Sequence, residues 1–328
     1  MATWQGRRVL VTGAYGFLAS HLIEALVSRG AEVIGLVRDR PAESYLQLQG
    51  LDRRITLAPG DLTDFGAVKR ALLEGEAEVV FHLAAQAIVG LANRSPLSTF
   101  ESNIRGTYLL LEACRELRQD GAPIAAIVVA SSDKAYGDQE KLPYTEEAPL
   151  LGLHPYDASK SCCDLLTRAM SKTYGLPAAV TRCANLYGPG DLNFSRIIPA
   201  TILSLLRRER PVIRSDGSPQ RDYLYVADCV EGYLALGEAL LAGRGVGQAY
   251  NLGTGKPVSV LELVGEIIAV VGSDLEPDVQ GTASSEILHQ YLDASRAAAE
   301  LGWTARTRLH DGLRLTYEWY TRYHQAHG

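Results

Sequence analysis

The chain of 328 residues is poor in cysteine, has no excess of basic residues and contains no long apolar run. Its 32 Lys and Arg stand against 38 Asp and Glu, and the net charge of −6 argues against general binding of nucleic acid. No stretch approaches the ~20 apolar residues that a membrane span needs. We therefore expect neither a nucleic acid nor a membrane as a partner.

Metal-binding and secretion patterns are also lacking. The five cysteines do not have the spacing of zinc ligands, and the seven histidines form no HExxH motif. An odd number of cysteines is typical of reduced thiols in a cytoplasm. The first residues, MATWQGRRVLVTG, lack an apolar region followed by a small-residue cleavage site, so no secretion signal is predicted. We expect a cytoplasmic protein without a metal site.

Short apolar runs alternate with helical patterns in the first half of the chain. The expected strands are Arg8–Thr12, Glu32–Val37, Ile55–Ala58, Val79–Leu83, Ile124–Ala130 and Ala178–Arg182. The expected helices are Ala19–Ser28, Phe65–Glu74, Thr99–Arg118 and Ser159–Tyr174. Continuously apolar strands that alternate with helices indicate a parallel sheet covered on both faces. The predicted fold class is therefore α/β, with a Rossmann-type doubly wound sheet.

The composition of the chain changes after Asn185, where proline and arginine become frequent. We predict a dinucleotide-binding Rossmann domain over residues 1–184 and a smaller C-terminal α/β substrate lobe mainly over 185–328. The chain is expected to return to the first domain around 222–252, with a strand at Gln248–Leu252. The pattern of Leu309–His324 predicts a closing amphipathic helix.

A glycine-containing loop follows the first strand. Its spacing is Gly-x-x-Gly-x-x-Ala, and glycines there let the backbone approach a pyrophosphate at the N-terminus of the next helix. The same turn also occurs for structural reasons alone, but its place between a strand and a helix favours a dinucleotide site. The loop residues assigned to the cofactor are Gly13, Tyr15, Gly16, Phe17 and Leu18.

Three further strand ends fit the same cofactor. After the third strand, we assign Asp61 and Leu62 to the cofactor. After the fourth strand, we assign Leu83, Ala84, Ala85 and Gln86 to it. The second strand ends in Arg38-Asp39-Arg40. An acid there holds the ribose hydroxyls of NAD, whereas an arginine pairs with the 2′-phosphate of NADP. We assign Arg38 and Asp39 to the cofactor and predict NAD from Asp39, with NADP as the alternative through Arg38 and Arg40.

Two motifs carry candidate catalytic residues. Tyr156 and Lys160 are four residues apart, which places them on one face of a helix. An ammonium beside a phenol lowers its pKa, so the phenolate can take a proton from a sugar hydroxyl. Ser132 ends a strand, where it is expected to hydrogen-bond the reacting hydroxyl. Asp133 and Lys134 beside it are a candidate acid–base pair, although a surface ion pair would look the same.

These motifs together resemble the extended short-chain dehydrogenase/reductase family of nucleotide-sugar epimerases and dehydratases, over nearly the whole chain. The segments that carry the resemblance are VTGAYGFLAS, GDLTD, FHLAAQA, SNIRGT, SSDKAYG, PYDASK, RCANLYGPG, RDYLYVAD, YNLGTG and LDASRAAAELGW. It implies a nicotinamide cofactor contacted by Tyr156 and Lys160, which act with Ser132 as the catalytic residues. It also implies a C-terminal lobe for a nucleotide sugar.

The residues after Ser132 separate two chemistries in this family. Epimerases usually have small or neutral residues there, and 4,6-dehydratases have an acid; Asp133-Lys134 is similar to CDP-glucose 4,6-dehydratases. The implied reaction converts an NDP-hexose to an NDP-4-keto-6-deoxyhexose by internal hydride transfer through bound NAD(P). In it Tyr156 takes the C4 hydroxyl proton, Lys134 the C5 proton, and Asp133 protonates the C6 oxygen. The alternatives are a 4-epimerase of the UDP-glucose or UDP-glucuronate type and, more remotely, a non-catalytic dinucleotide-binding protein.

The substrate site and the assembly follow from the same resemblance. Residues expected at the substrate are Gln86, Ser132, Asn185, Arg196 and Arg221. Arg196 and Arg221 are expected on the diphosphate, because guanidinium forks match phosphate oxygens. In relatives the helices corresponding to 99–118 and 159–174 pair across a twofold axis, so a homodimer is expected.

Overall fold

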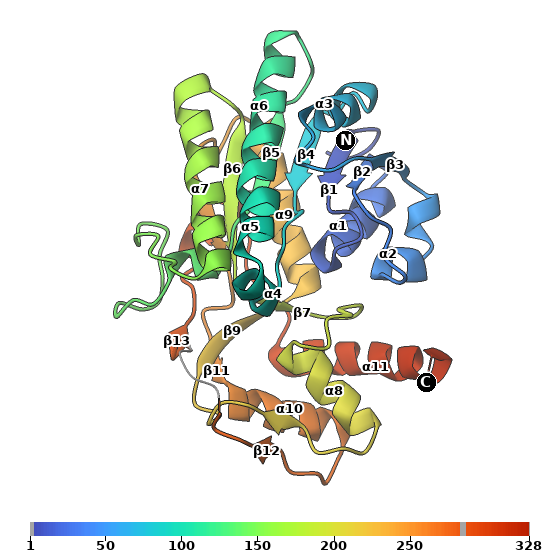
Figure 1. Cartoon of the computed structure of the whole chain (residues 1–328), viewed down its shortest axis with the longest axis vertical. Helices are drawn as coiled ribbons and strands as arrows, with labels where there is room; N and C mark the ends of the chain where they lie inside the picture. The colour runs from blue at the N-terminus through green and yellow to red at the C-terminus, as the bar shows by residue number, and fades with distance from the viewer. Residues whose placement is uncertain (1–2, 283–286, 328) are drawn as a thin grey trace.

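The computed structural model describes residues 3–282 and 287–327. Its main body is a seven-stranded sheet in the order β10-β6-β5-β4-β1-β2-β3, and every neighbouring pair is parallel (Figure 1). The strands are β1 (Arg8–Thr12), β2 (Glu32–Val37), β3 (Thr56–Pro59), β4 (Val79–His82), β5 (Ala126–Ala130), β6 (Ala178–Cys183) and β10 (Ala249–Leu252). The predicted α/β class with a doubly wound parallel sheet is confirmed.

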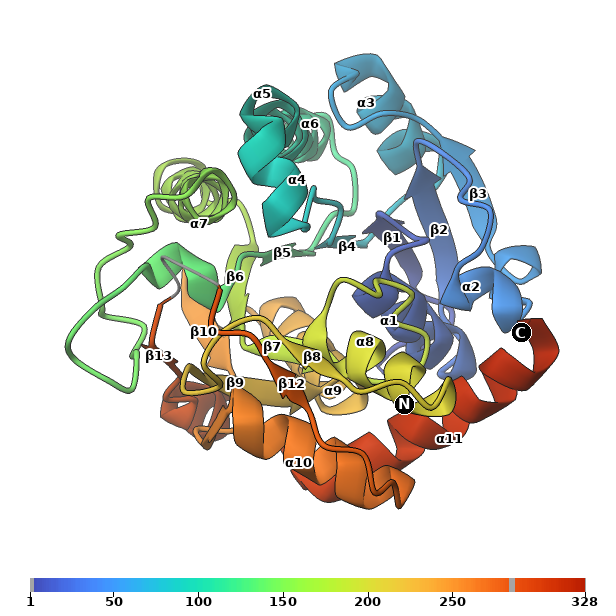
Figure 2. The same ribbon diagram turned by 60° about the horizontal axis from the view of Figure 1, so that its bottom comes forward.

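Helices cover both faces of this sheet, as Figure 2 shows. They are α1 (Phe17–Ser28) and α9 (Val226–Leu241) on one face, and α3 (Phe65–Glu74), α6 (Gly106–Gln119) and α7 (Pro155–Tyr174) on the other. Side chains alternate along β1: Val9 and Val11 enter the core under α1 and α9, and Leu10 enters the core under α3 and α6. Burial on both faces explains why the strands are continuously apolar.

Two predicted helices differ from the structure. The stretch expected over Thr99–Arg118 is α5 (Pro96–Phe100), a π-helical turn η2 (Glu101–Arg105) and α6. The helix expected from Ser159 begins at Pro155, because proline fits the first turn of a helix, where its missing N–H is not needed. Tyr156 therefore lies inside α7.

The C-terminal part has its own small sheet and helices. Its strands are β7 (Asn185–Tyr187), β9 (Gln220–Tyr225), β11 (Pro257–Ser259) and β13 (His289–Gln290), with a separate pair, β8 (Val212–Ile213) and β12 (Asp278–Val279). Its helices are α8 (Ile197–Leu206), α10 (Val260–Val271) and α11 (Leu309–His327). These helices and β9 bury a third apolar core.

The remaining elements are short. They are α2 (Tyr45–Leu48), α4 (Val89–Arg94), η1 (Leu51–Arg53), η3 (Asp133–Tyr136) and η4 (Ala297–Leu301). Among the described residues, no helix combines the length and the apolar character needed to cross a membrane.

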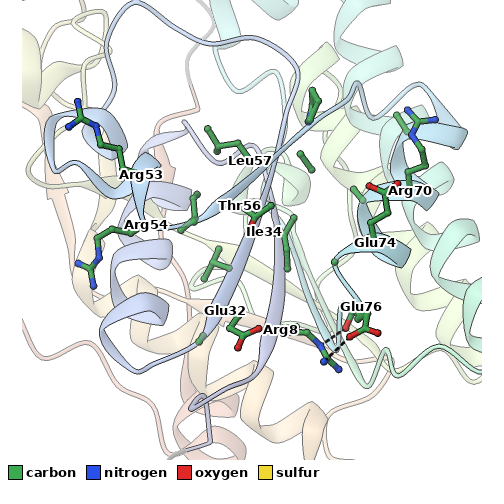
Figure 3. Close-up of a pocket in the computed structure, with 18 residues that line it drawn as sticks. Arg8, Glu32, Ile34, Arg53, Arg54, Thr56, Leu57, Arg70, Glu74 and Glu76 are labelled. Carbon is green, nitrogen blue, oxygen red and sulfur yellow. Dashed lines mark hydrogen bonds and ion pairs between the residues drawn. The ribbon is translucent and has the colours of Figure 1, made fainter.

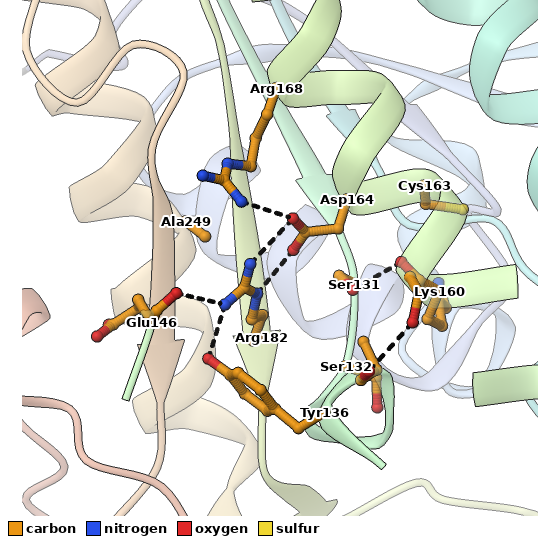
Figure 4. A network of polar contacts seen from close by, with 12 residues as sticks. Ser131, Ser132, Tyr136, Glu146, Lys160, Cys163, Asp164, Arg168, Arg182 and Ala249 are labelled. Atoms are coloured by element: carbon orange, nitrogen blue, oxygen red, sulfur yellow. Dashed lines mark hydrogen bonds and ion pairs between the residues drawn. The ribbon is translucent and has the colours of Figure 1, made fainter. Parts of the chain in front are cut away.

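A buried ion pair links α7 to β6 (Figure 4). The Arg182 guanidinium donates to both oxygens of Asp164, at 2.7 and 3.0 Å, and both side chains are almost fully buried. Its remaining nitrogen donates to the Tyr136 hydroxyl at 2.8 Å and to the Glu146 carbonyl at 3.1 Å. Arg168 approaches Asp164 from the surface at 3.7 Å.

Removal of one partner from this pair should be costly, because it leaves the other charge buried and unpaired. We expect Asp164→Asn to lower the free energy of unfolding by about 3–5 kcal/mol. Arg168→Ala serves as the control: its side chain is 44% exposed, so its loss should cost less than ~1 kcal/mol. Denaturant titration of both variants tests this, and equal costs would contradict it.

Candidate active site

The loops after β1 and β4 pack main chain against main chain. A Cβ on Gly13 would lie 2.8 Å from the Ala84 Cα, and Gly13 has a φ of +71°, so only glycine fits there. The Thr12 hydroxyl accepts hydrogen bonds from the main-chain N–H groups of Leu83 and Ala84, both at 3.1 Å. These contacts leave a glycine loop whose backbone faces the carboxyl edge of the sheet.

That loop fits a dinucleotide. Gly16 is the exposed N-cap of α1, and Phe17 and Leu18 form the first helical turn, so free N–H groups of the helix end point out of the loop. The Tyr15 hydroxyl is buried and has no hydrogen-bond partner in the described structure, as expected for a group that waits for a ligand. The residues assigned to the pyrophosphate thus form one cradle.

The predicted ribose and adenine residues form a charged cluster at the ends of β2 and β3. Arg38 donates to Asp39 at 2.6 Å and lies 3.9 Å from Asp61, with the first two side chains mostly exposed. Burial works against the Asp61 carboxylate, but hydrogen bonds from Thr63 and the Arg38 charge lower its pKa overall. Asp39, which favours NAD, and Arg38, which favours NADP, therefore lie together at the ends of β2 and β3.

The segment after β4 is held by a residue to which we assigned no role from the sequence. Asn103 accepts a hydrogen bond from the main-chain N–H of Gln86 at 2.7 Å, and its amide donates to the Gln86 carbonyl and to the Ser159 hydroxyl. Asn103 lies in the π-helical turn η2, a feature common at functional sites. The only signal in the sequence was its place in the SNIRGT segment.

The predicted catalytic residues come together at the carboxyl end of β5. The Lys160 ammonium lies 5.9 Å from the centre of the Tyr156 ring and donates to the Ala130 carbonyl at 2.8 Å. Burial lowers the pKa of Lys160. Burial raises the pKa of Tyr156, and a hydrogen bond with Ser132 opposes this only in part. The expected lowering of the phenol pKa is therefore wrong for the protein alone, because the cost of burying a phenolate prevails.

Asp133 is the most unusual carboxyl of the site. Its residue is 2% exposed; Oδ1 accepts from the Ser132 hydroxyl at 3.1 Å, while Oδ2 is buried without a hydrogen-bond partner. Burial raises the pKa of Asp133 against the opposing charges of Lys134 and Arg221. A raised pKa favours the protonated carboxyl, which can donate a proton, and this fits the predicted acid.

Lys134 does not stand alone beside this acid. Its ammonium donates to the side-chain oxygen of Gln290, from β13, and its charge acts on both Asp133 and Asp157. Asp157, on the first turn of α7, is buried, and burial raises its pKa. Neither Gln290 nor Asp157 was assigned a role from the sequence, since no local motif marks them.

The predicted substrate residues are more dispersed. Arg196 is the N-cap residue of α8 and pairs with Asp191 at 3.0 Å, and its charge offsets in part the burial that raises the pKa of Tyr156. Arg221 donates to main-chain carbonyls, and its charge reaches Asp133. Asn185 donates to the Asp222 carbonyl at 3.3 Å, which joins β7 to β9. The two arginines thus lie near the catalytic groups, while Asn185 has a structural contact.

A hollow of about 840 Å³ lies away from this site (Figure 3). It opens between α3 and the edge strand β3, and Arg8 and Glu76 form an ion pair of 2.9 Å at its border. Four arginines and three glutamates are among the residues that line it, and none of the catalytic candidates does. Since ligands of doubly wound sheets bind at the carboxyl ends of the strands, we do not assign the reaction to this hollow. Within the described residues, no group of His, Cys, Asp and Glu is arranged to hold a metal ion.

A model of the NAD dependent epimerase/dehydratase family matches residues 9–253. This stretch includes the glycine loop, Asp133 and the Tyr156–Lys160 pair. The chain belongs to this family.

Curated members that resemble the chain include 4,6-dehydratases. The trifunctional UDP-glucose 4,6-dehydratase/UDP-4-keto-6-deoxy-D-glucose 3,5-epimerase/UDP-4-keto-L-rhamnose-reductase of Arabidopsis thaliana is 31% identical over 98% of this chain and 48% of its own length. The chain thus spans about half the length of such relatives. The CDP-glucose 4,6-dehydratase of Salmonella typhimurium is 31% identical over 97% of this chain and 91% of its own.

Solved structures of the family include both chemistries. The UDP-glucose 4-epimerase of Thermotoga maritima superposes with a TM-score of 0.88 at 29% identity, over 96% of this chain and 99% of that one. The dTDP-glucose 4,6-dehydratase of Streptomyces venezuelae, solved with NAD bound, gives a TM-score of 0.86 at 29% identity, over 97% and 98%. The fold of the family therefore does not separate an epimerase from a dehydratase.

The raised pKa of Asp133 predicts a pH-dependent cost to stability. Above its pKa in the folded protein, Asp133 is ionised in both states, and the buried charge destabilises the fold; below about pH 4 it is neutral in both. Asp133→Asn should therefore gain stability relative to the wild type as the pH rises from about 4 and reach a plateau above that pKa. Unfolding curves across this range measure the difference, and a difference independent of pH would contradict the prediction.

Proposed function

We propose that this chain is an NAD-dependent nucleotide-sugar 4,6-dehydratase, which converts an NDP-hexose to an NDP-4-keto-6-deoxyhexose. One observation carries the choice: the buried Asp133 carboxyl, with a raised pKa and a free oxygen, beside Ser132. Dehydration needs an acid for the departing C6 oxygen, and 4-epimerisation does not. The names of the similar proteins support this class of reaction.

NAD fits the residues at the carboxyl edge of the sheet. Gly13 and Gly16 would hold its pyrophosphate, Asp39 its ribose, and Tyr156 and Lys160 its nicotinamide end. Bound there, NAD would supply the acceptor and then the donor of the hydride that moves from C4 to C6 of the sugar. NADP is the alternative, since Arg38 is also available for a 2′-phosphate.

Oxidation at C4 requires a base. In our proposal Ser132 hydrogen-bonds the C4 hydroxyl, and Tyr156 accepts its proton. Because burial raises the pKa of Tyr156, the phenol needs help to ionise; Ser132 and the charge of Arg196 both favour the phenolate. Lys160 is fixed by the Ala130 carbonyl one helical turn away from the phenol.

Loss of water follows at C5 and C6. The new C4 ketone makes the C5 proton acidic, and Lys134 is our candidate base for that proton in its neutral amine form, because an ammonium has no lone pair to accept it. Asp133 gives its proton to the C6 oxygen as the C6–O bond breaks, so water leaves and a C5–C6 double bond remains. The hydride returns to C6 and a proton to C5, which gives the 6-deoxy sugar.

The main rival is an NDP-sugar 4-epimerase. It would use the same Ser132, Tyr156 and Lys160 and leave Asp133 idle, and the similarity to the Thermotoga maritima epimerase keeps it in view. Because the Asp133-Lys134 pair resembles CDP-glucose 4,6-dehydratases, CDP-glucose is the first substrate to test, with UDP-glucose and dTDP-glucose beside it. Mass analysis of the product decides: loss of water supports our proposal, and an isomer of unchanged mass contradicts it.

Variants of two residues should separate the two chemical stages. Asp133→Asn removes the transferable proton, and general acid catalysis is worth about 10²–10⁴-fold, so dehydration should fall by that order. C4 oxidation should persist, so a 4-keto sugar that retains its C6 oxygen should accumulate. Tyr156→Phe, in contrast, should leave the sugar unoxidised. Unimpaired water loss by Asp133→Asn would count against Asp133 as the acid.

We also propose a homodimer that pairs α6 and α7 of two copies. These helices lie side by side and expose Tyr108 (42%) and Leu165 (56%), apolar side chains that a four-helix bundle would cover. We expect a dimer by light scattering at micromolar concentration and a monomer for Leu165→Arg. Leu73→Arg is the matched control, because Leu73 is 59% exposed on α3 and should leave the dimer intact. A monomeric wild type would refute this assembly.

The cytoplasm is the compartment that we propose. All five cysteines lie in the described part of the chain and carry free thiols. Reducing compartments maintain thiols in that state.

A further inference from the structure

One residue of the C-terminal lobe reaches into the catalytic loop. Gln290, on β13, is fully buried at 0% exposure. Its amide nitrogen donates to the Asp133 carbonyl at 3.0 Å, and its amide oxygen accepts from the Lys134 ammonium. A single side chain, 157 positions away along the chain from Asp133, therefore contacts both members of the acid–base pair.

The main chain fixes Gln290 from both sides. β13 pairs in parallel with β9, and Gln290 is in register with Arg221. Just after Gln290, the Tyr144 N–H donates to the Tyr291 carbonyl at 3.0 Å, and the Asp293 N–H donates to the Tyr144 carbonyl at 2.9 Å. The amide thus has little freedom to turn away from the catalytic loop.

This placement matters because the two catalytic groups must act on different carbons. Asp133 has to face the C6 oxygen and Lys134 the C5 hydrogen, although the two residues are adjacent in the chain and the charge of Lys134 opposes the raised pKa of Asp133. Other charged groups also act on the pair: Asp157 from α7 faces Lys134, and Arg221 from β9 faces Asp133. The amide oxygen of Gln290 contacts the side-chain nitrogen of Lys134, and its amide nitrogen contacts the Asp133 carbonyl. These two contacts fix the position of Lys134 relative to Asp133.

We propose that Gln290 is a positioning residue of the dehydration step, which holds the side-chain nitrogen of Lys134 and the Asp133 main chain so that each side chain meets its own carbon of the sugar. The inference rests on the proposed 4,6-dehydratase function. It also gives the substrate lobe a direct part in catalysis, since Gln290 is paired through β9 with Arg221, a candidate for the diphosphate.

Gln290→Met tests the proposal, because it keeps the length and burial of the side chain and removes both hydrogen bonds. The full-length enzyme is used with the nucleotide sugar that the wild type accepts, and the products of a single turnover are weighed. Misplacement of reacting groups by about 1 Å can cost ~10²-fold, so water loss should fall by that order. C4 oxidation and binding of the nucleoside diphosphate, measured by calorimetry, should stay near wild-type levels. His289→Ala, on the same strand with an exposed side chain, should dehydrate normally.

The outcomes separate the two levels of the argument. A wild type that releases no water with any nucleotide sugar overturns the proposed function itself. If the wild type dehydrates and Gln290→Met does so equally well, or loses oxidation and dehydration in parallel, the role of Gln290 is refuted. Should Gln290→Met fail to fold, Gln290→Glu enters the same assay: it keeps an acceptor for Lys134 and loses the donor to Asp133, and selective loss of dehydration is again expected.

Discussion

The close approach of two main-chain segments, Gly13 on Ala84, is the constraint on which the site depends. Because no side chain fits between them, the ends of β1 and β4 are locked together, with Thr12 bridging their N–H groups. Asn103 then holds the segment after β4 by accepting a hydrogen bond from its main chain. The Asn103 amide also donates to Ser159, which links this segment to α7. The helix that bears the tyrosine and the lysine is thus positioned by the same contacts that shape the cofactor cradle.

Burial favours the neutral form of each ionisable group at the centre of this site. It raises the pKa of Asp133 and Tyr156 and lowers that of Lys160, and it lowers the pKa of His82 to about 3. Each shift favours the neutral form, as expected where water is excluded. For the proposed acid this is an advantage, since the protonated form is favoured, but for the proposed base, Tyr156, it is an obstacle that neighbouring charges must overcome. The stability of the fold is reduced in exchange for this chemistry.

The sequence predicted what depends on local patterns. Apolar runs located the seven strands of the main sheet to within a few residues, and spacing alone placed Tyr156 and Lys160 on one helical face. It did not predict the π-helical turn at Asn103 or the contacts of Gln290, because these depend on packing between segments far apart in the chain. The direction of the Tyr156 pKa shift was also missed, since desolvation is a property of the folded environment and no spacing encodes it.

A shared scaffold with two chemistries requires that the difference between them be small and local. In our proposal Ser132, Tyr156 and Lys160 serve the oxidation of a sugar at C4 in either case, so they do not decide which reaction follows. Whether dehydration follows oxidation depends on the group that contacts the C6 oxygen. A carboxyl that is solvated there would be ionised at neutral pH and unable to protonate a leaving oxygen, whereas burial raises the pKa of Asp133 and so favours its protonated form. Under the proposed function, the choice of reaction in this chain therefore depends on the environment of one carboxyl, which residues from both lobes create.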